Sequence, residues 1–300
     1  MKKLLKWIGI LLLIIIIVGI VAFFTMKGKG GDKLTQTYTV DVTDVQVLTD
    51  SAALARGAHL VNVACKECHG ENLAGMALID DESFGKLYAP NLTPGQGGCG
   101  NFTVTDWVRA MRHGVAPDGT SLMIMPSISF QYFSDYDLGA MIGYLQSLEP
   151  IDGVVPKKEF VPFIQFLLGV GAFDSELQAM NIDHGSITHV PQPNLADPME
   201  QGDYLHRIAG CNHCHGKDMA GAKSGDPDSP PAPNITKGGK LANWTQADFI
   251  TAMRTGKTPE GIEINPRFMP INAFKRFTDQ ELQDIYTYIA AQPALPDAVK

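Results

Sequence analysis

The chain begins with a long hydrophobic run. Residues 7–24 are eighteen positions without a charge, and three lysines, Lys2, Lys3 and Lys6, precede them. This length matches the hydrocarbon core of a bilayer and exceeds the hydrophobic region of a typical signal peptide. No small-residue cleavage pattern follows the run. We therefore expect residues 1–27 to form an uncleaved, single-pass transmembrane anchor.

The segment after the anchor has two parts with different sequence patterns. Residues 28–32 are rich in glycine and resemble a flexible tether. Further along, Tyr38, Val40 and Val42 alternate with polar residues, which is the period of an extended chain. We expect residues 28–50 to be a tether that contains a short strand or an extended strap.

From about residue 51 the hydrophobic pattern becomes helical, and it repeats in the second half of the chain. Thr103 and Thr245 each begin an amphipathic segment with a Thr-x-x-Asp capping pattern, and both segments end at a glycine. Later helices start at Ser134 and Thr278 and end before a proline. An internal repeat of this kind predicts two similar domains and an all-α fold.

The repeat also divides the chain. We expect the first domain at residues 51–149, an interdomain connector at residues 150–198 and the second domain at residues 199–300. The connector is rich in proline and contains an uncharged stretch at residues 160–173. This stretch is either a helix for the membrane surface or a partner, or a segment that packs across both domains. We favour packing across both domains, because the stretch is too short to span a membrane and its glycines weaken a helix.

One five-residue motif occurs in each domain. Residues 65–69 and 211–215 both have the pattern Cys-x-x-Cys-His, 146 positions apart. In a helical turn this spacing places two thiols and an imidazole on one face. It is the attachment pattern of c-type haem, in which the thiols bind the porphyrin and the histidine binds the iron. We therefore predict two covalently bound haem c groups. The predicted thioether residues are Cys65, Cys68, Cys211 and Cys214, and the proximal iron ligands are His69 and His215.

A Cys-x-x-Cys pair also occurs in zinc sites and in dithiol redox sites. The two motifs use four of the five cysteines, which leaves no second Cys-x-x-Cys or His-x-x-x-His pair to complete a zinc tetrahedron. The remaining cysteine, Cys99, lies among glycines. We expect it to be a free loop cysteine, with an intermolecular disulfide as the minor alternative.

A haem that carries electrons needs a second axial ligand, and methionine is one choice. Met111 and Met253 recur between the halves but lie on apolar helical stripes, which predicts a core position. Met125 and Met269 instead lie in loops, each before a proline, 56 and 54 residues after their proximal histidines. Because a proline stiffens the residue before it in an extended conformation, we predict Met125 and Met269 as distal iron ligands. A packing role is the alternative.

Three smaller assignments complete the predicted sites. Met123 competes with Met125, but its counterpart in the second half is Arg267, which cannot bind iron. The carbonyl groups of Pro90 and Pro233 are candidates to fix the tautomer of the proximal histidines. The other histidines have no matched partner in the opposite half, and we expect them to be surface or packing residues.

The overall charge limits the partners. The formal net charge is -8 at pH 7, so the chain lacks the basic balance expected of a nucleic-acid binder. An acidic surface suits docking to a basic redox partner, although an ordinary solvated surface explains the same charge. Because haem is attached covalently only in exported compartments, we expect both domains to lie outside the cytoplasmic membrane.

These features together carry a family resemblance. The two Cys-x-x-Cys-His motifs, the Met-Pro pairs at residues 125–126 and 269–270, and the Pro-Asn-(Leu/Ile)-Thr segments resemble the class I cytochromes c. The chain is more closely similar to membrane-anchored dihaem cytochromes with two such domains in tandem. It also looks similar to the cytochrome subunits of periplasmic alcohol, aldehyde or sugar-acid dehydrogenases. Those commonly have three haem motifs, and this chain has two.

The resemblance implies an electron carrier and not an enzyme. The expected donor is a periplasmic or membrane dehydrogenase or a respiratory complex, and the expected acceptor is a terminal oxidase, a small cytochrome or a copper protein. The expected location is the outer, periplasmic face of a bacterial inner membrane. A dihaem cytochrome c peroxidase is the main alternative, and a structural subunit of a larger complex is a third.

Overall fold

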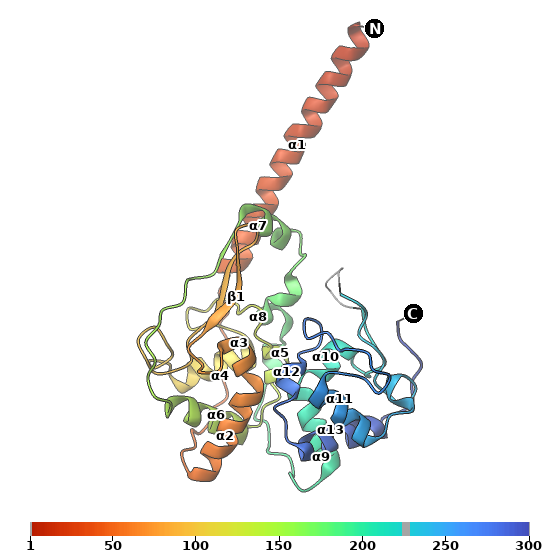
Figure 1. The fold of residues 1–300 in the computed structure, drawn as a ribbon. Helices are drawn as coiled ribbons and strands as arrows, with labels where there is room; N and C mark the ends of the chain where they lie inside the picture. The colour runs from red at the N-terminus through yellow and green to blue at the C-terminus, as the bar shows by residue number, and fades with distance from the viewer. Residues whose placement is uncertain (1, 224–228, 300) are drawn as a thin grey trace.

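A long helix projects from a body made of two halves (Figure 1). The computed structural model describes residues 2–223 and 229–299. The body is mostly helical, which confirms the predicted all-α class, and it includes one small sheet that the sequence did not predict. The N-terminal half of the body is attached to the projecting helix (Figure 1).

The projecting helix, α1 (Lys2–Thr35), is the one helix in the described part of the chain that is long and apolar enough to cross a membrane. None of its most hydrophobic part is buried in the body, although Phe23 near the end of the apolar run stacks on Phe166 at 5.3 Å between ring centroids. The helix continues through residues 28–32, so the flexible tether predicted there is wrong. The neighbouring helix α7 (Pro162–Gly169) explains why, because it packs against this part of α1.

The contact between α1 and α7 depends on two glycines. A Cβ atom at Gly30 would lie 1.8 Å from the carbonyl oxygen of Gln165, and one at Gly169 would lie 1.8 Å from that of Met26. Any larger residue at either position would therefore separate the helices. Lys33 adds a bond to the Leu168 carbonyl oxygen at 3.0 Å. Glycines that look flexible in the sequence are here the residues that permit close helix packing.

The connector therefore has a different role from the predicted one. Its helix α7 and the strand β3 (Glu159–Phe160) belong to the first half and do not pack across both domains. The strand completes an antiparallel sheet with β1 (Met76–Asp81) and β2 (Gly85–Ala89), in the order β1-β2-β3. The sheet, α7 and the end of α1 share an apolar cluster that includes Leu87, Phe160, Ile164 and Leu168.

Residues 36–50 form an extended strap and not a strand. The strap makes one isolated bridge, between Thr37 and Thr120. It then crosses α6 (Asp135–Gln146), where a Cβ atom at Gly139 would lie 2.1 Å from the carbonyl oxygen of Gln46. Of the two conformations expected from the alternating pattern, the strap is therefore the one that forms.

The two halves contain the same series of helices. The first half contains α2 (Ser51–Ala64), α3 (Lys66–His69), α4 (Val104–His113), α5 (Ser127–Phe130) and α6. The second contains α9 (Pro198–Ile208), α10 (Cys211–His215), α11 (Gln246–Thr255), α12 (Ile271–Phe274) and α13 (Asp279–Ala291). Short elements complete the connector and the second half, namely η1 (Asp174–Glu176), α8 (Gln178–Asn181), η2 (His184–Ser186) and η3 (Lys240–Ala242).

Local signals explain where these helices begin, end and cross. Thr103 and Thr245 form full capping boxes, and Gly114 and Gly256 end the same helices in the left-handed conformation, as predicted. The first and last helices of each half cross at a glycine. At Gly57, for example, an added Cβ atom would lie 2.1 Å from the Ala140 carbonyl oxygen. The repeat in the sequence therefore corresponds to a repeat in the packing.

A buried ionic cluster joins the two halves. Arg56 binds Asp137 of its own half at 3.0 and 2.9 Å and Glu281 of the other half at 3.1 Å. His59 lies 2.8 Å from Glu281, and the hydroxyl of Tyr204 donates to Asp137 at 2.7 Å. Asp137 is fully buried. His59 and Tyr204 are counterparts in the repeat, as are Asp137 and Glu281, so the interface has approximate two-fold symmetry.

This cluster predicts an acid-sensitive interface. Burial opposes the ionisation of Glu281, but His59, the Thr278 N–H and Arg56 together lower the pKa of Glu281 below its usual value. A carboxylate with a lowered folded-state pKa stabilises the fold above its unfolded pKa, and that stabilisation is lost as the pH falls. We expect the free energy of unfolding to decrease from about pH 4.3 downward. Denaturant titrations followed by circular dichroism at several pH values measure this. Glu281→Gln should flatten the dependence, and an unchanged slope in that variant would contradict the assignment.

Candidate haem-binding sites

The first candidate site is built around a single helical turn. Cys65 is the N-cap residue of α3, and its carbonyl oxygen accepts from the N–H groups of Cys68 at 3.2 Å and His69 at 2.9 Å. This turn holds both thiols and the imidazole on one short element. His69 is 8% exposed, and its Nδ1 lies 2.8 Å from the carbonyl oxygen of Pro90. With Nδ1–H donating to that carbonyl, the lone pair of Nε2 remains available for a metal.

The second candidate site repeats this arrangement. His215 at the end of α10 is 8% exposed, and its Nδ1 lies 2.8 Å from the carbonyl oxygen of Pro233. Burial lowers the pKa of both proximal histidines, against the opposing effect of the bond to the proline carbonyl. Burial thus favours the neutral form of both imidazoles, which is the form that can bind a metal. The predicted contacts to the two proline carbonyls are confirmed.

An asparagine in each half fixes the segment that carries the proline. Asn91 accepts from the N–H of Thr93 at 2.9 Å and from its hydroxyl at 2.8 Å, and donates to the Ile151 carbonyl oxygen at 2.7 Å. Asn234 makes the equivalent bonds to Thr236 and to the carbonyl oxygen of Leu295. The repeated Pro-Asn-(Leu/Ile)-Thr segment is evident in the sequence, but no role was predicted for its asparagine. The recurrence of Asn-x-Thr in both halves is the sequence feature that points to this role.

The two Met-Pro loops have one conformation. The carbonyl oxygen of Met125 accepts from the N–H two residues later at 2.7 Å, and that of Met269 does so at 2.6 Å. Pro126 and Pro270, between these groups, have φ and ψ of −80° and 54°, and of −73° and 63°. These are inverse γ-turns, in which the proline ring fixes φ near its preferred value. Each turn leads into the one-turn helix α5 or α12.

The methionines differ in their surroundings. Met125 and Met269 are partly buried against the main core, whereas Met111 and Met253 lie inside it, 3% and 5% exposed, as their helical stripe predicts. Met123 packs instead against the separate apolar cluster that includes Phe160. The competitor therefore lies in a different cluster from Met125. The iron-binding role of Met125 and Met269 remains a prediction.

The thiols of the two motifs form no disulfide. Burial, together with the neighbouring thiol, raises the pKa of Cys65 and Cys211 to about 12. Cys99 is also free, as expected, but it is buried and donates to the carbonyl oxygen of Asn91 at 3.2 Å. This conformation leaves no exposed Cys99 thiol for the minor alternative of an intermolecular disulfide.

One buried polar atom supports the fit of haem to the first site. The indole N–H of Trp107 on α4 is buried and has no hydrogen-bond acceptor among the described residues. Trp107 packs in the same core as Cys65 and next to Phe102, with ring centroids 5.3 Å apart. A buried indole N–H normally has a partner. The carboxylates of haem are acceptors of the kind that this donor requires.

The two sites approach each other across the domain interface. Asn272 on α12, in the second half, donates to the carboxylate of Glu67 at 3.3 Å, and Glu67 lies between the two cysteines of the first motif. Arg276 pairs with Glu71, just after the same motif. In the other direction, a Cβ atom at Gly210, next to Cys211, would lie 2.9 Å from the hydroxyl of Ser129 on α5. The helix after each Met-Pro turn thus rests beside the haem motif of the other half.

The remaining histidines are distributed as follows. His59 belongs to the interface cluster, a role that the sequence did not indicate, because its partner Glu281 is 222 residues away. His113 is buried with its Nδ1 3.2 Å from that of His184, and His206 stacks on Tyr288. These are packing positions, as expected.

Two family models match this chain. Residues 188–292 match the model described as cytochrome c, and residues 52–145 match the model described as cytochrome c oxidase, cbb3-type, subunit III. One haem motif lies in each matched range. The two matches leave most of the connector between them.

Curated relatives agree with these matches. The chain is 28% identical to the fructose dehydrogenase cytochrome subunit of Gluconobacter japonicus, over 81% of this chain and 53% of that protein. It is 25% identical to the cytochrome c subunit of a quinone-dependent alcohol dehydrogenase of Gluconacetobacter polyoxogenes, over 82% of this chain and 57% of that protein. It is also 25% identical to a dihaem cytochrome c-type protein of Cereibacter sphaeroides, over 91% of this chain and 97% of that protein.

The dehydrogenase subunits are longer proteins. The chain spans about half the length of these two relatives, 53% of one and 57% of the other. The match to the dihaem protein, in contrast, covers nearly all of both sequences. The chain is therefore a dihaem cytochrome c, with two cytochrome c domains and two covalent haem c groups, and it resembles the cytochrome subunits of dehydrogenases.

Proposed function

We propose that this protein carries electrons from a dehydrogenase to a downstream acceptor such as a terminal oxidase, without catalysis of its own. The relatives named as dehydrogenase cytochrome subunits support the donor class. The apolar part of α1 and the exported chemistry of haem attachment favour a single-pass anchor in a bacterial inner membrane, with both domains on the periplasmic side.

The proposed ligand set is the one expected from the sequence. Cys65, Cys68, Cys211 and Cys214 would form the thioethers, with His69 and Met125 as axial ligands in the first domain and His215 and Met269 in the second. When bound, each haem supplies a one-electron couple, and methionine ligation raises its potential. The proline carbonyls orient the proximal imidazoles, and the Met-Pro turns hold the thioethers. We retain domain limits of 51–149 and 199–300, joined by residues 150–198.

The observation that carries the proposal is the reciprocal contact between the two sites. Asn272 of the second domain bonds to Glu67 within the first haem motif, and Ser129 of the first domain lies beside Gly210, next to the second motif. Such contacts favour two haem groups that act together. They also favour a fixed distance between the two sites.

A peroxidase is a weaker candidate. It needs one iron with an open or readily vacated position and a nearby acid/base group, so its two haem surroundings must differ. Here the proximal carbonyl contact and the Met-Pro turn recur in both halves with nearly the same geometry. Matched surroundings favour matched ligation.

The experiment uses the full-length, haem-loaded protein in detergent. Mass spectrometry should first find haem on peptides spanning residues 65–69 and 211–215. Both haem groups should be low-spin in either oxidation state, bind carbon monoxide poorly and leave peroxide unconsumed, because both have two axial ligands. Stopped-flow mixing should show fast electron exchange with a small soluble cytochrome, at a rate that depends on ionic strength. Sustained peroxide turnover by the half-reduced protein would overturn the carrier proposal.

A further inference from the structure

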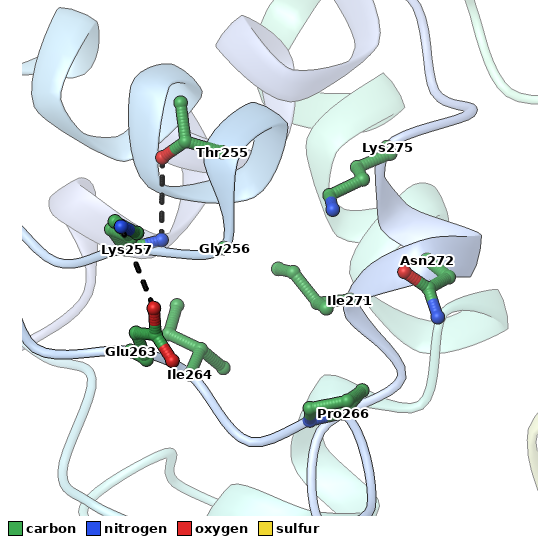
Figure 2. A pocket seen from close by; sticks show the side chains of 9 residues that line it. All are labelled: Thr255, Gly256, Lys257, Glu263, Ile264, Pro266, Ile271, Asn272 and Lys275. Atoms are coloured by element: carbon green, nitrogen blue, oxygen red, sulfur yellow. Dashed lines mark hydrogen bonds and ion pairs between the residues drawn. The ribbon is translucent and has the colours of Figure 1, made fainter.

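The second domain carries a hollow beside its Met-Pro turn (Figure 2). Its volume is about 190 Å³, and its walls come from the end of α11, the loop that follows and α12. Figure 2 shows Gly256 and Ile264 on one side and Ile271 and Lys275 on the other, with the amine of Lys275 directed into the hollow. We call this hollow the second groove.

The first domain contains the same groove. Leu122 donates its N–H to the Gly114 carbonyl oxygen at 2.7 Å, and Ile264 donates to that of Gly256 at 2.8 Å. The bridge between Val115 and Ser121 likewise recurs between Lys257 and Glu263. Both grooves therefore have the same backbone frame.

In the first domain the connector fills this groove. Gln178 donates its N–H to the carbonyl oxygen of Leu122 at 3.0 Å, and Ala179 donates to the hydroxyl of Ser121 at 3.1 Å. The side-chain oxygen of Gln178 accepts from the Ile128 N–H at 3.3 Å. A Cβ atom at Gly114 would lie only 2.5 Å from that of Gln178. The groove is thus a receptor for a short polypeptide segment.

In the second domain no segment lies there among the described residues. The closest atoms to a Cβ atom at Gly256 belong to Ile271, at 3.7 Å, and to the amine of Lys275, at 4.0 Å. The carbonyl oxygen of Ile264, the counterpart of Leu122, accepts no hydrogen bond within the described part of the chain. The second groove therefore has the same backbone acceptor as the first, without the segment that uses it.

The charges of the two grooves differ. In the first groove, Gln131 stands where the second has Lys275, and the bound side chain is the neutral Gln178. In the second, Lys257 and Glu263 are paired at 3.5 Å, whereas Lys275 makes no ion pair with any described residue. An acidic side chain at the position of Gln178 would complement Lys275.

We propose that the second groove binds a short segment of a partner protein at the start of a helical turn, in the way that the first turn of α8 in the connector binds the first groove. The segment would present a backbone N–H to Ile264, an acidic side chain to Lys275 and a small residue at the position of Ala179. This proposal does not depend on the electron-transfer function, because the groove either binds such a segment or does not.

The test uses the full-length, haem-loaded protein and a synthetic peptide with the sequence of residues 173–182. A second peptide carries Gln178→Glu. Isothermal titration should show that the Gln178→Glu peptide binds, and that Lys275→Ala weakens its binding roughly tenfold, as expected for loss of a charge-assisted hydrogen bond. Lys240→Ala is the matched control, because Lys240 is exposed in the same domain and does not line the groove.

Three results would overturn the proposal. The first is no binding by either peptide. The second is binding that Lys275→Ala leaves unchanged. The third is a dimer in sedimentation experiments that forms with rising protein concentration and is lost in Lys275→Ala, which would assign the groove to a second copy of this chain.

Discussion

Replacing Met269 with alanine is expected to remove the long-wavelength iron–sulfur absorption of one haem and to leave that of the other. The expectation follows from the proposed binding of the Met269 sulfur to the iron. The inverse γ-turn at Pro270 supports it, because this turn holds the methionine beside the core of the second domain. The reduction potential of that haem should fall by on the order of a hundred millivolts, since axial ligands set haem potentials over about 0.8 V. Absorption spectra and a redox titration of the full-length protein measure both effects.

The second domain offers a matched control. Met253 is also a methionine of the main core, but it is 5% exposed and lies on the apolar face of α11. Met253→Leu should keep both spectra and both potentials. Met125→Ala should change the haem of the first domain in the same way that Met269→Ala changes the haem of the second domain. If Met269→Ala leaves the spectrum unchanged, the ligand lies elsewhere.

The largest loss of stability is expected from Asp137→Ala. This fully buried carboxylate accepts two bonds from Arg56 and one from Tyr204, and it lies at the centre of the domain interface. Its removal would leave the Arg56 guanidinium group with Glu281 as its remaining carboxylate and the buried Tyr204 hydroxyl without its acceptor. Breaking a buried ion pair in this way costs about 3–5 kcal/mol. Denaturant titration of the haem-loaded protein measures the change.

An exposed ion pair serves as the control for this prediction. Asp279 binds Arg254 at 2.6 Å, but its side chain is 68% exposed. Asp279→Ala should lower the free energy of unfolding by no more than about 1 kcal/mol. A similar loss in both variants would show that the buried cluster has no special role in joining the domains.

The parts of the structure that depend on neighbouring residues were predictable. The capping boxes at Thr103 and Thr245 and the left-handed Gly114 and Gly256 follow from residues within one helix. The Cys-x-x-Cys-His turns are equally local, because five adjacent residues contain all the chemistry. The bond from each proximal histidine to a proline carbonyl could be anticipated only because the whole segment recurs.

The predictions that were wrong or missing concern contacts between segments that are far apart in the sequence. The glycines near residue 30 suggested a tether, and only the approach of Gln165, 135 positions away, makes them helical. The sheet was missed because its third strand comes from the connector, and β3 contributes only two residues. The segment-binding role proposed for the second groove could not be inferred from the sequence either. It depends on the hydrogen bond that Gln178 makes in the equivalent groove of the first domain.

The continuous helix α1 has a consequence for how partners meet this protein. A flexible tether of residues 28–50 would let the domains sweep through roughly 25 Å. Instead α1 continues eleven residues past the apolar run, to Thr35, and α7 packs closely against it at Gly30. The contacts of α7 run along α1 from Phe23, which stacks on Phe166, to Lys33, so the body begins beside the end of the apolar run. A partner must then meet the first domain in one orientation relative to α1, because packed helices and not a loose chain join the two.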